Sequence, residues 1–114
     1  MPRRSDRLLL QDILEALGDI EAFTTGMTHE AFAADRRTIH AVCRCLEIVG
    51  EAASRLSPTM IARMPGPPWN ALRGLRNRIV HAYFAVDTEI VHRICTEDLG
   101  QLKAAIMATL DQEP

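Results

Sequence analysis

The stretch from residue 28 to residue 56, THEAFAADRRTIHAVCRCLEIVGEAASRL, decides the fold class. Its apolar residues recur every three or four positions, which is the spacing of one face of an α-helix. Thr28 can cap the start of this helix, and Ser57-Pro58 ends the pattern. The spacing therefore predicts one long helix over residues 28–56, with a buried face made of Ile39, Val42, Leu46, Val49, Ala53 and Leu56.

The segments on either side also show helical spacing. We expect a first helix over about residues 5–23, a short helical turn up to Met64, a helix over about residues 68–84 that begins with Pro68, and a last helical segment between Asp87 and Asp111 that Thr96 could divide. No stretch alternates with period two. The sequence thus predicts an all-α fold, an antiparallel bundle of four or five helices that forms a single domain over residues 1–114.

Gly74 lies in the middle of the helix expected over residues 68–84. Glycine in a helix interior costs about 1 kcal/mol relative to alanine. Its presence suggests that a partner helix or a ligand passes close to the backbone at this point.

Length and composition narrow the class of protein further. The 114 residues are 47% hydrophobic but only 4% aromatic, which predicts one core built from Leu, Ile, Val and Ala. Every apolar run is much shorter than the roughly 20 residues of a membrane span. The chain starts with an amphipathic segment, and its three cysteines are an odd set. We therefore expect a cytoplasmic protein with free thiols and no membrane partner.

The charge distribution points to a local basic patch. A net charge of −2 argues against a protein that coats nucleic acid non-specifically, because that affinity comes from neutralising many phosphates. Four basic side chains nevertheless fall within nine residues: Arg73, Arg76, Arg78 and His81. Such a patch can bind RNA on a mildly acidic body.

The segment RNRIVHAY, residues 76–83, carries the candidate chemistry. On an ideal helix Asn77 and His81 lie about 40° apart, whereas Arg76 and His81 lie about 140° apart. Two side chains so far apart do not converge easily on one phosphate. Either the helix loosens near His81, or two copies of the segment meet in a symmetric dimer.

Structural roles compete with this interpretation. Arg73 and Arg78 fit a solvated basic helix end. Arg76 could pair with Glu47 or Glu51, His81 could be a hydrogen-bonded ring, and Tyr83 could be a core aromatic.

A zinc site is a further alternative. His40 and Cys43 form one His-x-x-Cys pair, and His92 and Cys95 form another. Two such pairs could supply four tetrahedral ligands. Neither pair has the clustered spacing of zinc modules, and small buried thiols are common beside apolar faces, so we expect no metal here.

RNRIVHAY resembles the ribonuclease motif of the HEPN superfamily, an Arg followed by a polar residue and, after a short spacer, a His. Tyr83, two residues beyond the His, resembles the HepT-like variant of this motif. The helix segment LEIVGEAA at residues 46–53, the Pro68-Trp69 start and the segment YFAVD at residues 83–87 are also similar to that family. The resemblance covers nearly the whole chain.

This resemblance implies an endoribonuclease toxin that needs neither metal nor cofactor and cleaves RNA at a homodimer interface. His81 would accept a proton, Arg76 would stabilise the phosphate, and Asn77 would orient the imidazole or hold the phosphate. Arg73 and Arg78 would bind RNA.

The resemblance also implies regulation. A cognate nucleotidyltransferase antitoxin would silence the toxin by attaching AMP to Tyr83. Glu51 would at most have a supporting role at the catalytic site. The alternative is a non-catalytic helical dimer that binds RNA or serves as a regulatory subunit of a nucleotidyltransferase.

Overall fold

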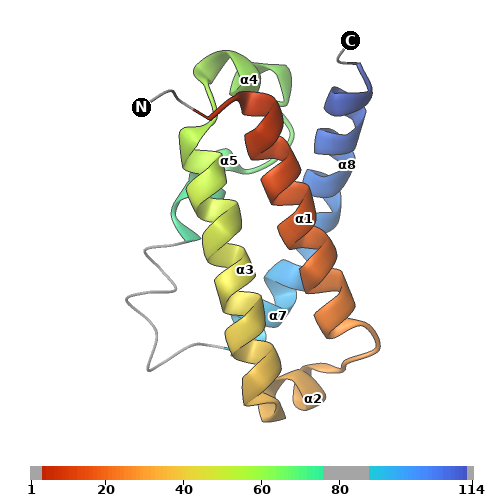
Figure 1. Cartoon of the computed structure of the whole chain (residues 1–114). Helices are drawn as coiled ribbons and strands as arrows, with labels where there is room; N and C mark the ends of the chain where they lie inside the picture. Colours follow the sequence, from red (N-terminus) through yellow and green to blue (C-terminus); the bar gives the residue numbers. More distant parts are fainter. Residues whose placement is uncertain (1–3, 76–87, 113–114) are drawn as a thin grey trace.

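The computed structural model describes residues 4–75 and 88–112, and these residues form an all-α fold (Figure 1). No strand occurs among them. In chain order the elements are α1 (Asp6–Thr24), α2 (His29–Ala34), α3 (Arg36–Arg55), α4 (Pro58–Arg63), α5 (Trp69–Arg73), α7 (Thr88–Arg93), the π-helical turn η2 (Ile94–Asp98) and α8 (Leu99–Asp111). The predicted fold class is confirmed.

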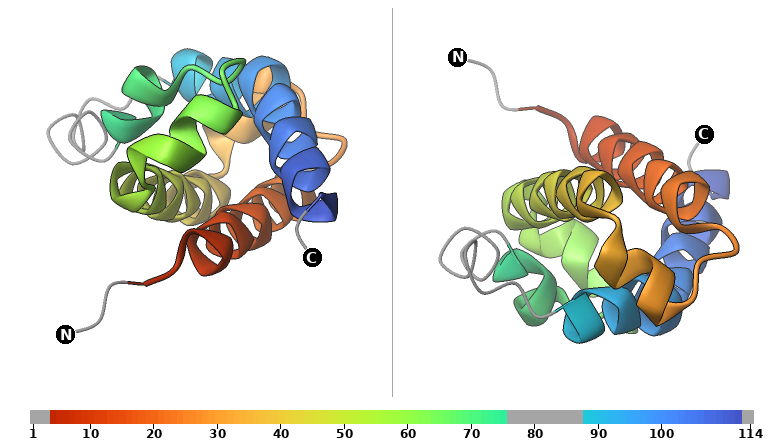
Figure 2. Two further views of the ribbon diagram at one scale, coloured as in Figure 1. Left: turned by 90° about the horizontal axis from the view of Figure 1, so that it is seen from above. Right: turned by 90° about the horizontal axis from the view of Figure 1, so that it is seen from below.

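The core lies between α1, α3 and α8. Helix α1 runs antiparallel to both α3 and α8, and the two views along the bundle show α3 and α8 on either side of α1 (Figures 1 and 2). The largest fully buried side chains belong mainly to these three helices: Leu9, Leu10, Ile13, Leu17, Ile20, Phe32, Val42, Leu46, Val49, Leu102 and Ile106. Aliphatic side chains thus dominate the core, as the composition predicts.

Hydroxyl side chains cap the starts of α1, α2 and α4, and the cap by Thr28 was predicted. The Ser5 hydroxyl accepts a hydrogen bond from the Leu8 backbone N–H at 3.2 Å, and the Thr28 hydroxyl accepts one from Ala31 at 3.1 Å. Ser57 caps α4, and its hydroxyl also donates to the Asp6 carboxylate at 2.6 Å. That contact ties the start of α4 to the start of α1.

The prediction of one helix over residues 28–56 was wrong, because the chain breaks at Asp35. The Asp35 backbone is extended, with φ −109° and ψ 90°. Its carboxylate accepts hydrogen bonds from the backbone N–H and the hydroxyl of Thr38, at 3.1 and 2.9 Å. Aspartate competes with the helix for backbone donors, and here it caps a new one. The apolar face predicted for α3 is confirmed, with Ile39 only partly buried.

Two further expectations about helices need correction. Within the described residues α5 ends at Arg73 with Gly74 as its C-cap, and the rest of the helix expected over residues 68–84 lies outside them. A Cβ on Gly74 would meet only carbonyl oxygens of its own segment, at 3.5 and 3.7 Å, so among the described residues no partner approaches it.

Thr96 does not start a new helix. It lies inside η2, where its hydroxyl donates to the His92 carbonyl at 3.0 Å, and α7, η2 and α8 follow one another directly. Across the parts of the chain that the structure describes, no helix is both long enough and apolar enough to cross a membrane.

Candidate functional site

Most of the predicted site falls outside the described residues. Arg76, Asn77, Arg78, His81 and Tyr83 all lie within residues 76–87. Of the predicted site residues only Arg73 is described, and its side chain is exposed on α5. The structure therefore informs the site through the segments on either side, which we name the upstream flank (residues 69–75) and the downstream flank (residues 88–93).

The upstream flank is held by buried apolar side chains. Trp69 is 6% exposed, and its indole N–H donates to the Met64 carbonyl at 2.7 Å. Leu72 and Leu75 are buried as well, and α5 packs against α3. Because these three residues point inward, the exposed Arg73 lies on the outer side of the flank, where an anionic ligand can reach it.

The downstream flank is held by polar and aromatic contacts with α2. The Thr88 hydroxyl lies 3.4 Å from Nε2 of His29. The His92 ring lies 5.8 Å from the ring of His29 and 5.6 Å from that of Phe32, measured between centroids. Nε2 of His92 is buried and has no hydrogen-bond partner among the residues that the structure describes. Val91 adds a buried apolar side chain to this flank.

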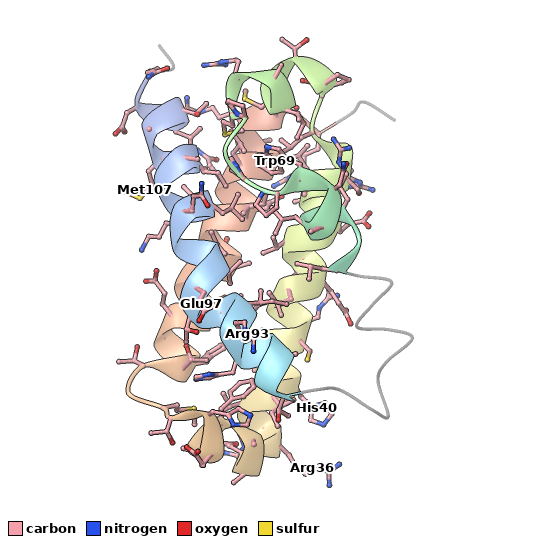
Figure 3. All side chains as sticks on the ribbon, turned by 180° about the vertical axis from the view of Figure 1, so that it is seen from behind. Arg36, His40, Trp69, Arg93, Glu97 and Met107 are labelled. Carbon is pink, nitrogen blue, oxygen red and sulfur yellow. The ribbon has the colours of Figure 1, made fainter. Side chains whose placement is uncertain are left out.

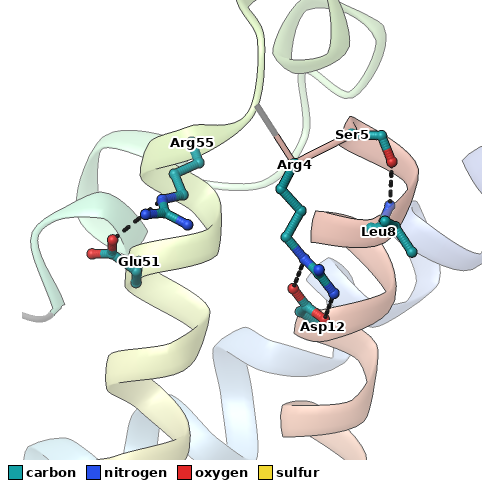
Figure 4. Close-up of polar contacts among 6 residues, drawn as sticks. All are labelled: Arg4, Ser5, Leu8, Asp12, Glu51 and Arg55. Carbon is teal, nitrogen blue, oxygen red and sulfur yellow. Dashed lines mark hydrogen bonds and ion pairs between the residues drawn. The ribbon is translucent and has the colours of Figure 1, made fainter. Parts of the chain in front are cut away.

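Glu51, the residue expected to give support at most, belongs to an ion pair on α3. Its carboxylate lies 3.4 Å from Nε of Arg55 (Figure 4). It lines a groove of about 300 Å³ between α1 and α3, with an apolar floor of Leu9, Ile48 and Ala52.

The same groove contains two more ion pairs. Arg4 binds Asp12 through two contacts of 2.7 and 2.9 Å, and Arg44 lies 3.3 Å from Glu47. The hydrogen bond with Asp12 raises the pKa of Arg4. Since each arginine of the groove faces a carboxylate, the groove offers no net positive charge to RNA.

The two His-x-x-Cys pairs do not form a ligand set. All four residues are described, and no group of three or more metal-binding side chains occurs in residues 4–75 and 88–112. The thiols of Cys43, Cys45 and Cys95 are free, as predicted. Burial raises the pKa of Cys95 to about 12, with a further contribution from Cys43 and Cys45, so this thiol stays protonated and binds metal poorly near neutral pH.

The contact between His29 and His92 was not predicted from the sequence. Both residues are half-buried, and they are brought together by the packing of α2 against α7. No local spacing connects them, because they belong to separate helices far apart in the chain. The sequence contains only four histidines, and this small number is the one hint it gives, because it does not say which of them meet.

Comparisons with known proteins extend these observations. The family model for "Ribonuclease HepT-like" proteins matches residues 13–109. A candidate RNase of Methanocaldococcus jannaschii is 41% identical over 91 residues, which cover 80% of this chain and 75% of the relative. "Probable ribonuclease HepT" of Thermococcus cleftensis is 38% identical over 101 residues, with 89% and 92% covered. No solved structure matches the chain significantly.

Proposed function

This chain belongs to the HepT-like ribonuclease family, and from that premise we propose that it is a metal-independent endoribonuclease toxin whose centre is RNRIVHAY at residues 76–83. The observation that carries the proposal is the extent of the family match. Residues 13–109 include both flanks and the whole motif between them. The exposed Arg73 on the upstream flank adds a cation beside the motif.

The chemistry follows from the residue types in the motif. The 2′-hydroxyl of one nucleotide attacks the adjacent phosphorus, and His81 accepts its proton. The O2′–P bond forms while the P–O5′ bond breaks, which leaves a cyclic phosphate and a 5′-hydroxyl that takes up a proton. Arg76 stabilises the extra negative charge on the phosphate oxygens through two parallel hydrogen bonds. Asn77 orients the imidazole or the phosphate, and Arg78 joins Arg73 in binding RNA.

Incubation of the chain with a mixed RNA pool in EDTA tests this proposal. The wild type is expected to cut RNA and to leave cyclic phosphate ends, whereas His81→Ala binds RNA without cutting it. Arg7→Gln, which removes an exposed cation from α1, is a control that keeps full activity. If well-folded wild type does not cut, or if His81→Ala cuts as fast as the wild type, the chain is instead a non-catalytic RNA-binding or regulatory subunit.

A dimeric site explains how Arg76 and His81 act together despite their separation of about 140° on an ideal helix. In this arrangement Arg76 of one copy works with His81 of the other. A mixture of Arg76→Ala and His81→Ala chains then regains about a quarter of wild-type activity, because half of the dimers are hybrids and each hybrid has one intact site. If both residues act within one copy, the mixture stays inactive.

Regulation by a nucleotidyltransferase antitoxin completes the proposal. Transfer of AMP to Tyr83 would place a bulky anion next to Arg76 and His81, which blocks RNA by occupancy and by repulsion. Tyr83 is the only tyrosine of the chain, so a mass increase of the intact protein that is lost in one variant, Tyr83→Phe, assigns the AMP to this residue. The mass increase with ATP and a partner nucleotidyltransferase should disappear in Tyr83→Phe. An equal increase in that variant would exclude Tyr83 as the target.

A further inference from the structure

The end of the bundle where α2, α7 and the start of α3 meet exposes several basic side chains. Arg36 and His40 are exposed on α3, and Arg93 is exposed on α7. Figure 3 shows Arg36 and His40 at the lower right and Arg93 above them on α7, where Glu97 of η2 is its labelled neighbour. The downstream flank thus contributes Arg93 to this end of the molecule.

The carboxylates described on and just after α2 are engaged at helix starts. Hydrogen bonds from Thr38 lower the pKa of Asp35, which caps α3. Hydrogen bonds from its own backbone N–H and from Thr28 lower the pKa of Glu30 at the start of α2. Both groups are thus ionised near neutral pH and used by the fold. The exposed side chain of Arg36 projects away from the bundle (Figure 3).

The spacing of the basic groups suits a phosphate backbone. Arg36 and His40 are four residues apart on one face of α3, about 6 Å along the helix axis, which is comparable with the separation of adjacent phosphates in single-stranded RNA.

We propose that Arg36, His40 and Arg93 form a phosphate-binding surface that holds single-stranded RNA to one side of the cleavage position. This inference rests on the proposed function, since it assigns a second contact region to the same substrate. The surface contributes affinity without reading bases, because the guanidinium groups of Arg36 and Arg93 bind phosphate oxygens and not base edges. It makes the enzyme prefer long strands over short ones.

Binding is measured first in the His81→Ala background, with a labelled single-stranded RNA at several salt concentrations. Arg36→Gln and Arg93→Gln are each expected to weaken binding about fivefold at low salt and to lower the slope of log affinity against log salt by about 0.7, the value for one phosphate contact in a single strand. Arg7→Gln, at the opposite end of the bundle, is the matched control and leaves both quantities unchanged. If Arg36→Gln and Arg93→Gln bind RNA with the same affinity and the same salt slope as Arg7→Gln, the proposal is overturned.

Cleavage by chains with intact His81 then separates the surface from the catalytic site. Arg36→Gln should cut a trinucleotide as fast as the wild type and should cut a long oligonucleotide more slowly, through a higher KM with unchanged kcat. If Arg36→Gln cuts both substrates more slowly than the wild type, Arg36 belongs to the catalytic site and the proposal is overturned. If the wild type cuts neither substrate, the proposed function fails, while the binding data still decide whether this surface holds RNA.

Discussion

The two flanks of the catalytic motif are fixed by different kinds of contact. The upstream flank buries an indole and two leucines against α3 and makes one hydrogen bond of 2.7 Å from Trp69. The downstream flank meets α2 through a longer Thr88–His29 contact and two tilted ring contacts of His92, whose Nε2 is buried with no partner in residues 4–75 and 88–112. Trp69 and two leucines therefore anchor the upstream side of the motif by apolar burial, whereas the described contacts of the downstream side combine one buried valine with polar and aromatic groups.

The difference indicates which flank can change conformation at low cost. Removing a buried apolar side chain lowers the free energy of unfolding strongly, because neighbouring side chains rarely fill the cavity left at a close-packed position such as Trp69. A buried nitrogen without a partner already carries a desolvation penalty in the folded state. We expect the upstream flank to set the stability of the site and the downstream flank to tolerate substitution.

The largest expected effect is that of Trp69→Ala. It removes a nearly buried ring and its hydrogen bond, which should lower the free energy of unfolding by about 3–5 kcal/mol. Urea denaturation followed by circular dichroism measures the change. Trp69→Phe, which keeps most of the ring, is the matched control and should lose clearly less. A loss below about 1 kcal/mol for the alanine variant would remove the contrast between the flanks.

A much smaller effect is expected of His92→Leu on the downstream flank. The substitution replaces a ring whose buried nitrogen has no partner in the described part of the chain by an apolar side chain of similar size. The free energy of unfolding should change by less than about 1 kcal/mol in either direction. Trp69, the only tryptophan, reports unfolding by its fluorescence. A loss as large as that of Trp69→Ala would show that both flanks are anchored equally.

The smallest effect concerns the cap between α2 and α3, beside the downstream flank. The pKa of Asp35 lies below its ordinary value of 3.8 in the folded chain, chiefly because of the hydrogen bond from the Thr38 backbone. The ionised carboxylate therefore stabilises the fold above about pH 4, and this contribution is lost as the pH falls through the folded pKa. Asp35→Asn keeps an acceptor for Thr38 but no charge.

Wild type and Asp35→Asn should accordingly differ slightly in stability at pH 7 and converge at acidic pH. Thermal unfolding at a series of pH values measures this difference. A constant offset between the two proteins over the whole range would show that the charge of Asp35 contributes nothing.

The sequence predicted the helical class and one helix cap because these depend on nearby residues. Thr28 caps a helix as expected, and the buried face of α3 follows the spacing of its apolar residues. The break at Asp35 was missed, although its signal is local: an aspartate three residues before a threonine can cap a helix as well as lie inside one.

The candidate site divides in a similar way. Its catalytic residues could be named only from the motif and the family resemblance, and those side chains lie outside the described residues. The contacts of the downstream flank could not be predicted, because the pairing of His29 with His92 depends on how α2 packs against α7. The spacing of apolar residues along one helix contains no information about which residue of another helix its side chains will contact.

The π-helical turn η2 determines how this fold can respond to insertions and deletions. A π-turn accommodates one residue more than an α-turn, and each residue rotates a helix by about 100°. Loss of one residue within residues 94–98 would therefore leave an α-turn and keep Val91 and His92 of α7 facing α2, whereas gain of one more residue would turn that face of α7 away from α2. Leu102 and Ile106 of α8 would keep their places in the core. A residue gained in η2 would thus exchange the side chains beside the catalytic motif, whereas a residue lost there would not, and neither change would alter the sequence of the core.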